Sequence, residues 1–246
     1  MEWEAPAIIL DVRPFGEGDA VATVMTEEHG AHRGLARGGA SRGRAGLWQP
    51  GNLAQVRWVG RLADKLGSFS AELIHPAAAL AMDDALQLAM LSAACALAEG
   101  ALPEREAHPR VFGGLLTLIA GLAEGAALLA RLIRWEVLVL ADLGYGLDLS
   151  ACAVTGATDG LVYVSPKSGR ALSMEGAGTW APRMFPLPAL LLDESEGDPG
   201  QWREGLRLTG HFLARDVFGL RHLPLPLARQ ALYDRVAKLA ETESDV

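Results

Sequence analysis

Positive side chains gather in one stretch of this chain, between His29 and Lys65, where their chemistry suits the binding of phosphate groups. The cations there are Arg33, Arg37, Arg42, Arg44, Arg57, Arg61 and Lys65, and the single acid among them is Asp64. The chain as a whole is acidic, with a net charge of −8 and a pI near 5.3. A local cationic surface on an acidic protein is the footprint expected where a polyanion docks. A solvated loop that carries arginines for solubility is the alternative interpretation.

Glycines and one tryptophan accompany these arginines. The glycines are Gly34, Gly38, Gly39, Gly43 and Gly46. A backbone with few steric restrictions lets arginines follow an irregular phosphate track rather than form one fixed face. Trp48 lies in a turn-rich segment outside any alternating run, so its ring either closes the end of a fold or offers a base a stacking platform. Burial is the commoner fate of tryptophan, and we favour it.

Patterns for catalysis are missing from the sequence. Gly38 and Gly43 have the spacing of a phosphate-cradling loop, but Arg44 and Ala45 stand where a lysine and a serine or threonine are needed. No G-x-S-x-G motif marks a nucleophilic serine, although a triad assembled from distant residues stays possible. The sequence also lacks the clustered carboxylates of a metal-dependent enzyme that acts on nucleic acid. We therefore expect a protein that is not an enzyme and needs no cofactor.

Metal binding is not expected either. His29 and His32 are three residues apart, with no acid or cysteine nearby at ligand spacing, so a solvated or capping role is favoured over a metal site. A structural zinc site needs four converging ligands, and Cys152 has no partner cysteine close in sequence. Both Cys152 and Cys95 are most simply explained as small buried hydrophobic residues.

The size and composition of the chain suit a folded protein of one large or two modest domains. It has 246 residues, of which 50% are hydrophobic. The opening residues Met1 to Glu4 are acidic where a secretory signal is basic, and two cysteines make no disulfide framework. The most apolar region, Val111 to Leu140, is interrupted by charges, so no membrane segment is expected. These features predict a cytoplasmic protein.

Period-two alternation marks short, half-buried strands from Ala7 to His75. The alternating runs are Ile8 to Arg13, Val21 to Met25, Ala54 to Trp58 and Ser68 to Leu73, and a further strand is expected around Gly34 to Arg37. Five short antiparallel strands in this space match a small Greek-key barrel of the OB type. If Trp58 fills the barrel, alternation turns Arg57 toward solvent. Residues 1–76 are therefore expected to form an OB-fold, DNA-binding domain.

Helical patterns take over after Pro76. Ala77 to Glu99 predicts one helix with Asp83 and Asp84 in its first turns, and Val111 to Leu143 predicts two helices that meet near Gly121 to Gly125. The later elements are a strand at Leu161 to Val164, a turn at Pro166 to Arg170, and helices at Gln201 to Val217 and Leu225 to Ala240. The fold class expected is therefore α+β, with a helical domain over residues 77–246 and a hairpin insert at about 150–175.

Several short motifs carry a family resemblance through their order and spacing. In the first domain they are Gly16 to Asp19, Thr26 to Gly30, Gly34 to Ala40, Leu47 to Pro50 and Glu72, and in the second Leu143 to Leu147, Cys152 to Gly156 and Val164 to Gly169. Together they resemble the bacterial recombination mediator family RecO over nearly the whole chain. Family members that bind zinc carry four cysteines at the insert, whereas this chain keeps only Cys152. We therefore expect a zinc-finger-like hairpin that lacks the metal ligands.

The resemblance implies a mediator of DNA repair and recombination in the cytoplasm, associated with the nucleoid. Such proteins bind single- and double-stranded DNA, anneal complementary strands, work with RecR, and help RecA to load onto DNA coated by single-strand-binding protein. Sequence-tolerant contact with phosphates through counterion release fits the glycine-arginine loop. The expected DNA-binding residues are Arg33, Arg37, Arg42, Arg44, Arg57, Arg61, Lys65 and Trp48. Arg131 and Arg134 are candidates for docking the acidic tail of the single-strand-binding protein.

A helical scaffold that binds only other proteins is the competing hypothesis. In that case the barrel would have no DNA-binding surface, and the arginines would serve solubility. Gel shifts with poly-dT in low and high salt distinguish the two hypotheses, because only phosphate contacts make binding depend steeply on salt.

Overall fold

The computed structural model describes residues 1–61 and 66–244 of the chain. It divides into two compact units, Met1–Gly125 and Ala126–Val246. The first unit combines the N-terminal strands with the helices that follow them up to residue 125, so it is larger than the domain of residues 1–76 expected from the sequence.

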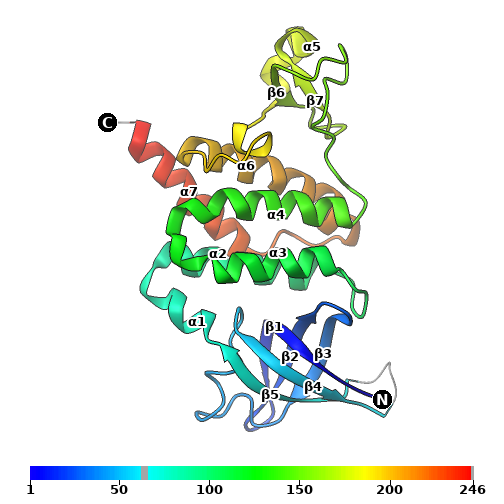
Figure 1. The fold of residues 1–246 in the computed structure, drawn as a ribbon, viewed down its shortest axis with the longest axis vertical. Helices are drawn as coiled ribbons and strands as arrows, with labels where there is room; N and C mark the ends of the chain where they lie inside the picture. Colours follow the sequence, from blue (N-terminus) through cyan, green and yellow to red (C-terminus); the bar gives the residue numbers. More distant parts are fainter. Residues whose placement is uncertain (62–65, 245–246) are drawn as a thin grey trace. The chain divides into compact units, whose positions relative to one another are not determined.

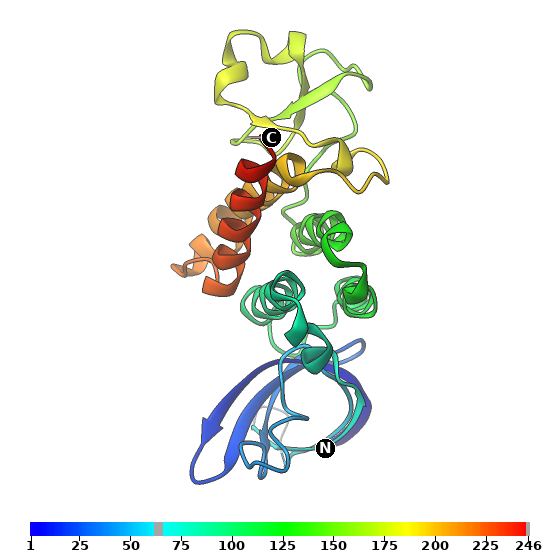
Figure 2. The same cartoon turned by 90° about the vertical axis from the view of Figure 1, so that its left-hand side faces the viewer.

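The strands of the first unit form a closed barrel, shown in blue to cyan in Figures 1 and 2. They are β1 (Glu2–Phe15), β2 (Asp19–Thr26), β3 (Gly30–Ala36), β4 (Leu53–Val59) and β5 (Ser68–His75). Their order around the barrel is β1-β2-β3-β5-β4, which confirms the predicted OB-type fold. The expectation that all pairs are antiparallel is wrong for β3 and β5. These two strands pair in parallel, through Leu35 with Ser68 and Ala36 with Phe69, and so close the barrel.

Strand β1 is longer than its alternating segment suggested, and its middle is buried on both faces. Ile8, Ile9 and Leu10 are all at most 2% exposed. A register shift between Ile9 and Asp11 locally breaks the alternation of faces. Helix α2 (Ala85–Ala101) also packs on β1, so the outer face is covered as well as the inner one. A strand covered on both sides loses the simple inward and outward alternation.

The barrel interior is filled by large aromatic and aliphatic side chains. Val56 is fully buried and Trp58 is 2% exposed, whereas Arg57 between them is exposed. This confirms the predicted orientation of β4. Gly34 makes room for the core, because a Cβ there would lie 2.7 Å from the ring of Phe69. The barrel is therefore a packed core with its charged side chains outside.

Short and long helices follow the barrel in the first unit. They are α1 (Ala77–Leu80), the 3-10 helix η1 (Ala81–Asp83), α2, and α3 (Pro109–Ala120). The single helix expected from Ala77 to Glu99 is wrong, since the chain breaks at Asp84. The extended Asp84 caps α2, and its carboxylate accepts hydrogen bonds from the backbone N–H of Leu86 (2.7 Å) and Gln87 (3.0 Å).

The second unit is built on α4 (Leu128–Asp142), α6 (Pro199–Phe212) and α7 (Leu227–Ser244). The 3-10 helix η2 (Leu122–Ala127) precedes α4, a π-helix η5 (Leu213–Phe218) continues α6, and a 3-10 turn η6 (Gly219–Arg221) ends it. The predicted helix pairs are confirmed, including the break near Gly125, which has a positive φ of 65°. Within the described residues, no single helix is long and apolar enough to span a membrane; only the bent pair Pro109–Ala120 and Leu122–Asp142 meets that test, taken together.

A small sheet is inserted between α4 and α6, shown in green to yellow in Figure 1. Its elements are β6 (Leu161–Val164), β7 (Ala171–Ser173), α5 (Met174–Ala177), η3 (Gly178–Arg183), β8 (Phe185–Pro186) and η4 (Ala189–Leu191). The predicted hairpin is β6 and β7, but β8 adds a further strand in the order β7-β6-β8. The insert therefore extends beyond the expected residue 175. His211 and Arg215 hold its turn through the carbonyl oxygen of Pro166.

A buried ionic cluster lies among the helices of the second unit. Glu136 of α4 and Arg229 of α7 are 1% and 2% exposed. The Arg229 guanidinium donates through Nε to one oxygen of Glu136 and through Nη2 to the other at 2.9 Å. The Thr209 hydroxyl of α6 also donates to Glu136, and the Leu206 carbonyl accepts from Arg229 at 2.7 Å. Every partner in this cluster is supplied by the same unit.

Candidate nucleic-acid interface

The segment between β3 and β4 is a series of hydrogen-bonded turns. The Gly39 N–H donates to the Ala36 carbonyl (3.0 Å), and the Gly38 N–H donates to Asp19 Oδ1 (2.7 Å). Gly38 has a φ of +67°, and a Cβ on Gly39 would lie 2.9 Å from the Ala36 oxygen. Glycine is therefore required at both positions by the turn itself, and the arginines are carried on a shaped backbone.

Three arginines of this segment, Arg37, Arg42 and Arg44, form what we call the cationic loop. All are exposed. None has a carboxylate within ion-pair distance among the residues that the structure describes, and Arg44 Nη1 instead donates to the Arg37 carbonyl at 3.4 Å. Arg61, just after β4, is also exposed and has no ion-pair partner in the described ranges. Within the described residues, these guanidinium groups are therefore exposed without a counter-charge.

Arg33 and Arg57 differ from the cationic loop, because carboxylates of the first unit already balance their charge. Arg33 pairs with Glu104 at 2.9 Å and with Glu99 at 3.1 Å. Arg57 pairs with Glu2 at 2.8 Å, and both side chains are about half exposed. Exposed pairs of this kind are weak and can exchange partners, but they lower the local positive potential. The sequence could not reveal these pairs, since their acids lie far away along the chain.

A groove of about 370 Å³ runs over the outer surface of β4 and β5. Arg44 and Arg57 line it, together with Glu4 and Glu72. Gln55 is in the same groove and donates to Glu4 at 3.1 Å. Because carboxylates and guanidinium groups alternate there, the groove has no uniform positive potential. The cationic loop, by contrast, has three exposed guanidinium groups without carboxylate partners in the described residues.

The remaining predicted residues fall into different settings. Trp48 is 5% exposed and stacks on Phe69 with ring centroids 6.1 Å apart, so it closes the barrel core, the fate that tryptophan was expected to have. Lys65 lies outside the described residues. In the second unit, the Arg134 guanidinium donates to the carbonyls of Leu190 (2.8 Å) and Asp193 (3.0 Å), which holds that segment in place. Arg131 is exposed on α4.

Cys152 lies where the insert turns, among small polar residues. Its sulfur accepts hydrogen bonds from the Ser173 hydroxyl (3.4 Å) and the Thr155 N–H (3.5 Å), and these lower the pKa of the thiol to about 6. A Cβ on Gly176 would lie 2.5 Å from the same sulfur. Cys152 is a single thiol surrounded by Ser173, Thr155 and Gly176, and this set does not supply the four ligands of a structural zinc ion. Across the described residues, no group of three or more His, Cys, Asp or Glu side chains could hold a metal.

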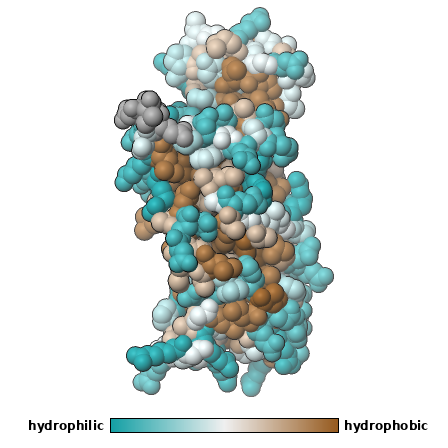
Figure 3. Space-filling view, turned by 60° about the vertical axis from the view of Figure 1, so that its left-hand side comes forward, coloured by the Kyte–Doolittle hydropathy of each residue, from teal (hydrophilic) through white to brown (hydrophobic). Residues whose placement is uncertain are grey.

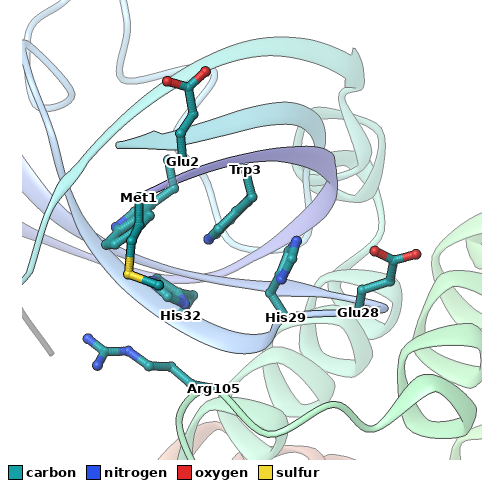
Figure 4. A pocket seen from close by; sticks show the side chains of 8 residues that line it. Met1, Glu2, Trp3, Glu28, His29, His32 and Arg105 are labelled. Carbon is teal, nitrogen blue, oxygen red and sulfur yellow. The ribbon is translucent and has the colours of Figure 1, made fainter. Parts of the chain in front are cut away.

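The end of the barrel contains an aromatic cavity that sequence reasoning did not find. Figure 4 shows Trp3, His29 and His32 directed toward one space, with Arg105 beside them. Trp3 comes from β1 and His32 from β3, and Arg105 follows α2, so only the barrel register brings them together. The sequence signal was the pair His29 and His32, for which a solvated or capping role was favoured over a metal site. The solvated role is wrong for His32, which is 6% exposed.

Comparison with known proteins decides the family. The family model described as Recombination protein O N terminal matches residues 1–77, and the one described as Recombination protein O C terminal matches residues 82–224. The chain belongs to the RecO family. A DNA repair protein RecO of Granulibacter bethesdensis is 58% identical over 250 residues, covering 100% of this chain and 99% of that protein. The RecO of Acidiphilium cryptum is 54% identical over 249 residues, with 100% and 99% covered.

The family resemblance inferred from the motifs is therefore confirmed over both domains. The RecO of Gluconacetobacter diazotrophicus is 55% identical over 248 residues, covering 97% of this chain and 96% of that protein. The two matched regions of the RecO models meet between residues 77 and 82, where α1 and η1 follow the barrel. The proteins compared are named for DNA repair, and their names state no ligand or partner.

Proposed function

We propose that this RecO protein is a DNA repair and recombination mediator that binds single- and double-stranded DNA through the cationic loop. The observation that supports this most directly is the exposure of Arg37, Arg42 and Arg44 without partner carboxylates in the described residues, on a chain of net charge −8. Arg61 extends the surface, and Arg33 and Arg57 join it when a phosphate displaces their carboxylates. Trp48 does not belong to the surface because its ring is buried.

Strand annealing follows from such a surface without a catalytic residue. Arginines that hold phosphates neutralise the repulsion between two backbones and leave the base edges free to pair. Arginine contacts to phosphates carry no sequence information, so complementary strands of any sequence can be brought together. The mediator is proposed to act in the cytoplasm at the nucleoid and to have no enzymatic activity.

Protein partners complete the proposed role. A RecR-like protein and the single-strand-binding protein are the direct partners, and RecA is loaded onto the strand as they act. Arg131 and Arg134 are the proposed docking residues for an acidic tail, and the Arg134 guanidinium would have to leave its backbone carbonyls to take part. Figure 3 shows hydrophobic residues lying among hydrophilic ones on one face of the molecule. The exposed apolar side chains include Leu80, Met82 and Leu227, which could make protein contacts.

Charge reversal in the loop tests the proposal. The triple variant Arg37→Glu, Arg42→Glu and Arg44→Glu should bind poly-dT more weakly than the wild type. Its plot of log affinity against log salt should also be flatter, by about 0.7 for each single-strand phosphate that the variant no longer neutralises. The matched control reverses three exposed arginines outside the loop, Arg110, Arg183 and Arg235. It has the same net charge as the loop variant and should keep the wild-type salt slope.

Annealing of complementary oligonucleotides coated with single-strand-binding protein provides the second measurement, with and without the RecR-like partner. The loop variant should anneal more slowly than the control in both conditions. Unchanged poly-dT binding in the loop variant would contradict the assignment of the loop. If the wild type fails to bind poly-dT even in low salt, the scaffold that binds only protein becomes the better explanation.

A further inference from the structure

The barrel end contains a cavity of about 320 Å³ whose walls are aromatic. Trp3 stacks on His29 with ring centroids 4.7 Å apart and planes 24° apart. His32 meets the ring of Trp58 edge-on at 4.7 Å, and Trp58 lies nearly parallel to Trp3 at 6.2 Å. Pockets for small ligands measure roughly 300 to 1,000 Å³, so this one suits a single small planar group.

Buried polar atoms in this cavity lack partners. His32 is 6% exposed, and neither of its ring nitrogens has a hydrogen-bond partner in the part of the chain that the structure describes. The indole Nε1 of Trp3 is also buried without a hydrogen-bond partner among the described residues. Most buried polar groups in folded proteins are satisfied, so several unsatisfied atoms in one cavity indicate a ligand that completes them.

Arg105 brings a positive charge to the same cavity through an unusual backbone conformation. Its φ is +63°, a left-handed value that residues other than glycine seldom adopt. The Arg105 N–H donates to the Ala31 carbonyl at 2.7 Å, which ties this segment to β3. Gly30 packs so closely against the same segment that a Cβ would lie 1.9 Å from the Glu106 carbonyl oxygen. Strained backbone of this kind is concentrated at functional sites, and here it holds the guanidinium at the cavity.

We propose that this cavity holds one unstacked nucleobase of the bound single strand, with the adjacent phosphate on Arg105. The base would lie against the aromatic walls, as bases do on the stacking platforms of other single-strand binders. Trp3 Nε1 can only donate, and a neutral histidine has one donor and one acceptor. A base with a carbonyl beside a ring N–H, such as thymine, complements that set. This inference rests on the proposed DNA binding and adds a specific subsite to it.

The connection to the rest of the proposed surface comes from the strand register. Glu2 and Trp3 pair with Val59 and Trp58 across β1 and β4. Glu2 lines the cavity and is also the partner of Arg57, which lines the groove beside Arg44. Met1 and Gly60 exchange hydrogen bonds at 2.7 and 3.0 Å, so the exposed Arg61 follows directly from the edge of the cavity. The Glu2–Arg57 pair therefore links the cavity to the groove that Arg44 lines.

Abasic oligonucleotides separate base binding from backbone binding, because they keep the phosphates and lack the bases. We expect the wild type to bind dT20 roughly ten-fold more tightly than an abasic chain of the same length, the effect of removing one base stack. Two variants should reduce this preference to near one: His29→Ala, which removes the ring on Trp3, and Arg105→Gly, which suits the left-handed backbone. Arg110→Ala is the matched control and should keep the preference. Circular dichroism checks that each variant is folded.

Each alternative result has a distinct meaning. If the wild type binds dT20 and the abasic chain equally, the nucleobase subsite is overturned while DNA binding stands. If neither chain binds, the proposed function fails and the subsite fails with it. Free thymidine monophosphate is the last arm: binding tighter than that of dT20 would assign the cavity to a free nucleotide and overturn the strand subsite. Equal preferences in His29→Ala and the wild type would also contradict the inference.

Discussion

Two sets of polar side chains, one in each unit, differ in whether the fold supplies their partners. In the second unit, Glu136, Thr209 and Arg229 are buried and satisfy one another, and Arg134 is engaged by backbone carbonyls. In the first unit, the cationic loop has no carboxylate partner among the described residues, and the ring nitrogens of His32 are buried without partners there. Both sets are charged or polar, yet only the set in the second unit finds its hydrogen-bond and ion-pair partners within its own unit.

The difference teaches which polar groups support the fold and which are available for binding. A buried group that finds its partners inside the unit contributes to a unique structure. A buried group without partners lowers stability unless a ligand completes it. Arginine occurs in both settings, so residue type and local charge do not distinguish them. Only the partners that the fold supplies do so.

Breaking the buried cluster should produce the largest effect on stability. Glu136→Leu leaves the Arg229 guanidinium buried without its counter-charge, and we expect a loss of roughly 3 to 5 kcal/mol in the free energy of unfolding. Urea unfolding followed by circular dichroism measures it. The double variant Glu136→Leu with Arg229→Met should recover most of that loss, since replacing both partners of a buried pair removes the unpaired charge. A double variant no more stable than the single one would show that the unpaired Arg229 guanidinium does not cause the loss.

The next largest effect on stability should come from low pH, through the protonation of His32 in the first unit. Burial, with Arg105 and His29 nearby, lowers the pKa of His32 from 6.5 to about 4. The unfolded chain therefore binds a proton at His32 between pH 6.5 and 4, while the folded chain does not. Stability contributed by the neutral ring is present above pH 6.5 and is lost as the pH falls toward 4, by up to about 3 kcal/mol.

Urea unfolding at pH 7.0 and 4.5 tests this sign. The wild type should lose more free energy of unfolding between the two pH values than His32→Leu, which has no ring to protonate. His75→Gln is the matched control and should behave like the wild type. Equal pH dependence in His32→Leu and the wild type would show that other groups cause the acid sensitivity.

Much of the fold could be predicted from periodicity, and the failures have identifiable physical causes. The alternation in β4 correctly separated Trp58 from Arg57, because one face of that strand meets the core and the other meets solvent. It failed around Ile9, where α2 covers the outer face of β1. The helix expected from Ala77 breaks at Asp84 because an aspartate side chain satisfies the free N–H groups at the start of α2.

The candidate site was less predictable, since its properties depend on distant partners. The charge of the loop was visible in the sequence, but the pairing of Arg33 with Glu99 and Glu104 depends on the packing of the first unit. The register that places Trp3 beside Trp58 is equally invisible before the barrel closes. Arg229 lies in a stretch of sequence that resembles an exposed helix, yet it is 2% exposed because Glu136, far away along the chain, is its partner.

The smallest predicted effect concerns Arg57. This residue is exposed like the cationic loop, yet it has a carboxylate partner, Glu2. The Glu2 pair contributes at most about 0.5 kcal/mol to stability, since both side chains are about half exposed. Glu2→Gln should therefore leave urea unfolding nearly unchanged. It should instead tighten poly-dT binding slightly and steepen its salt dependence, because Arg57 gains a guanidinium free for a phosphate. In an Arg57→Ala background, Glu2→Gln should have a smaller effect. Weaker binding by Glu2→Gln would mean that Glu2 positions Arg57 for DNA rather than competing with DNA for it.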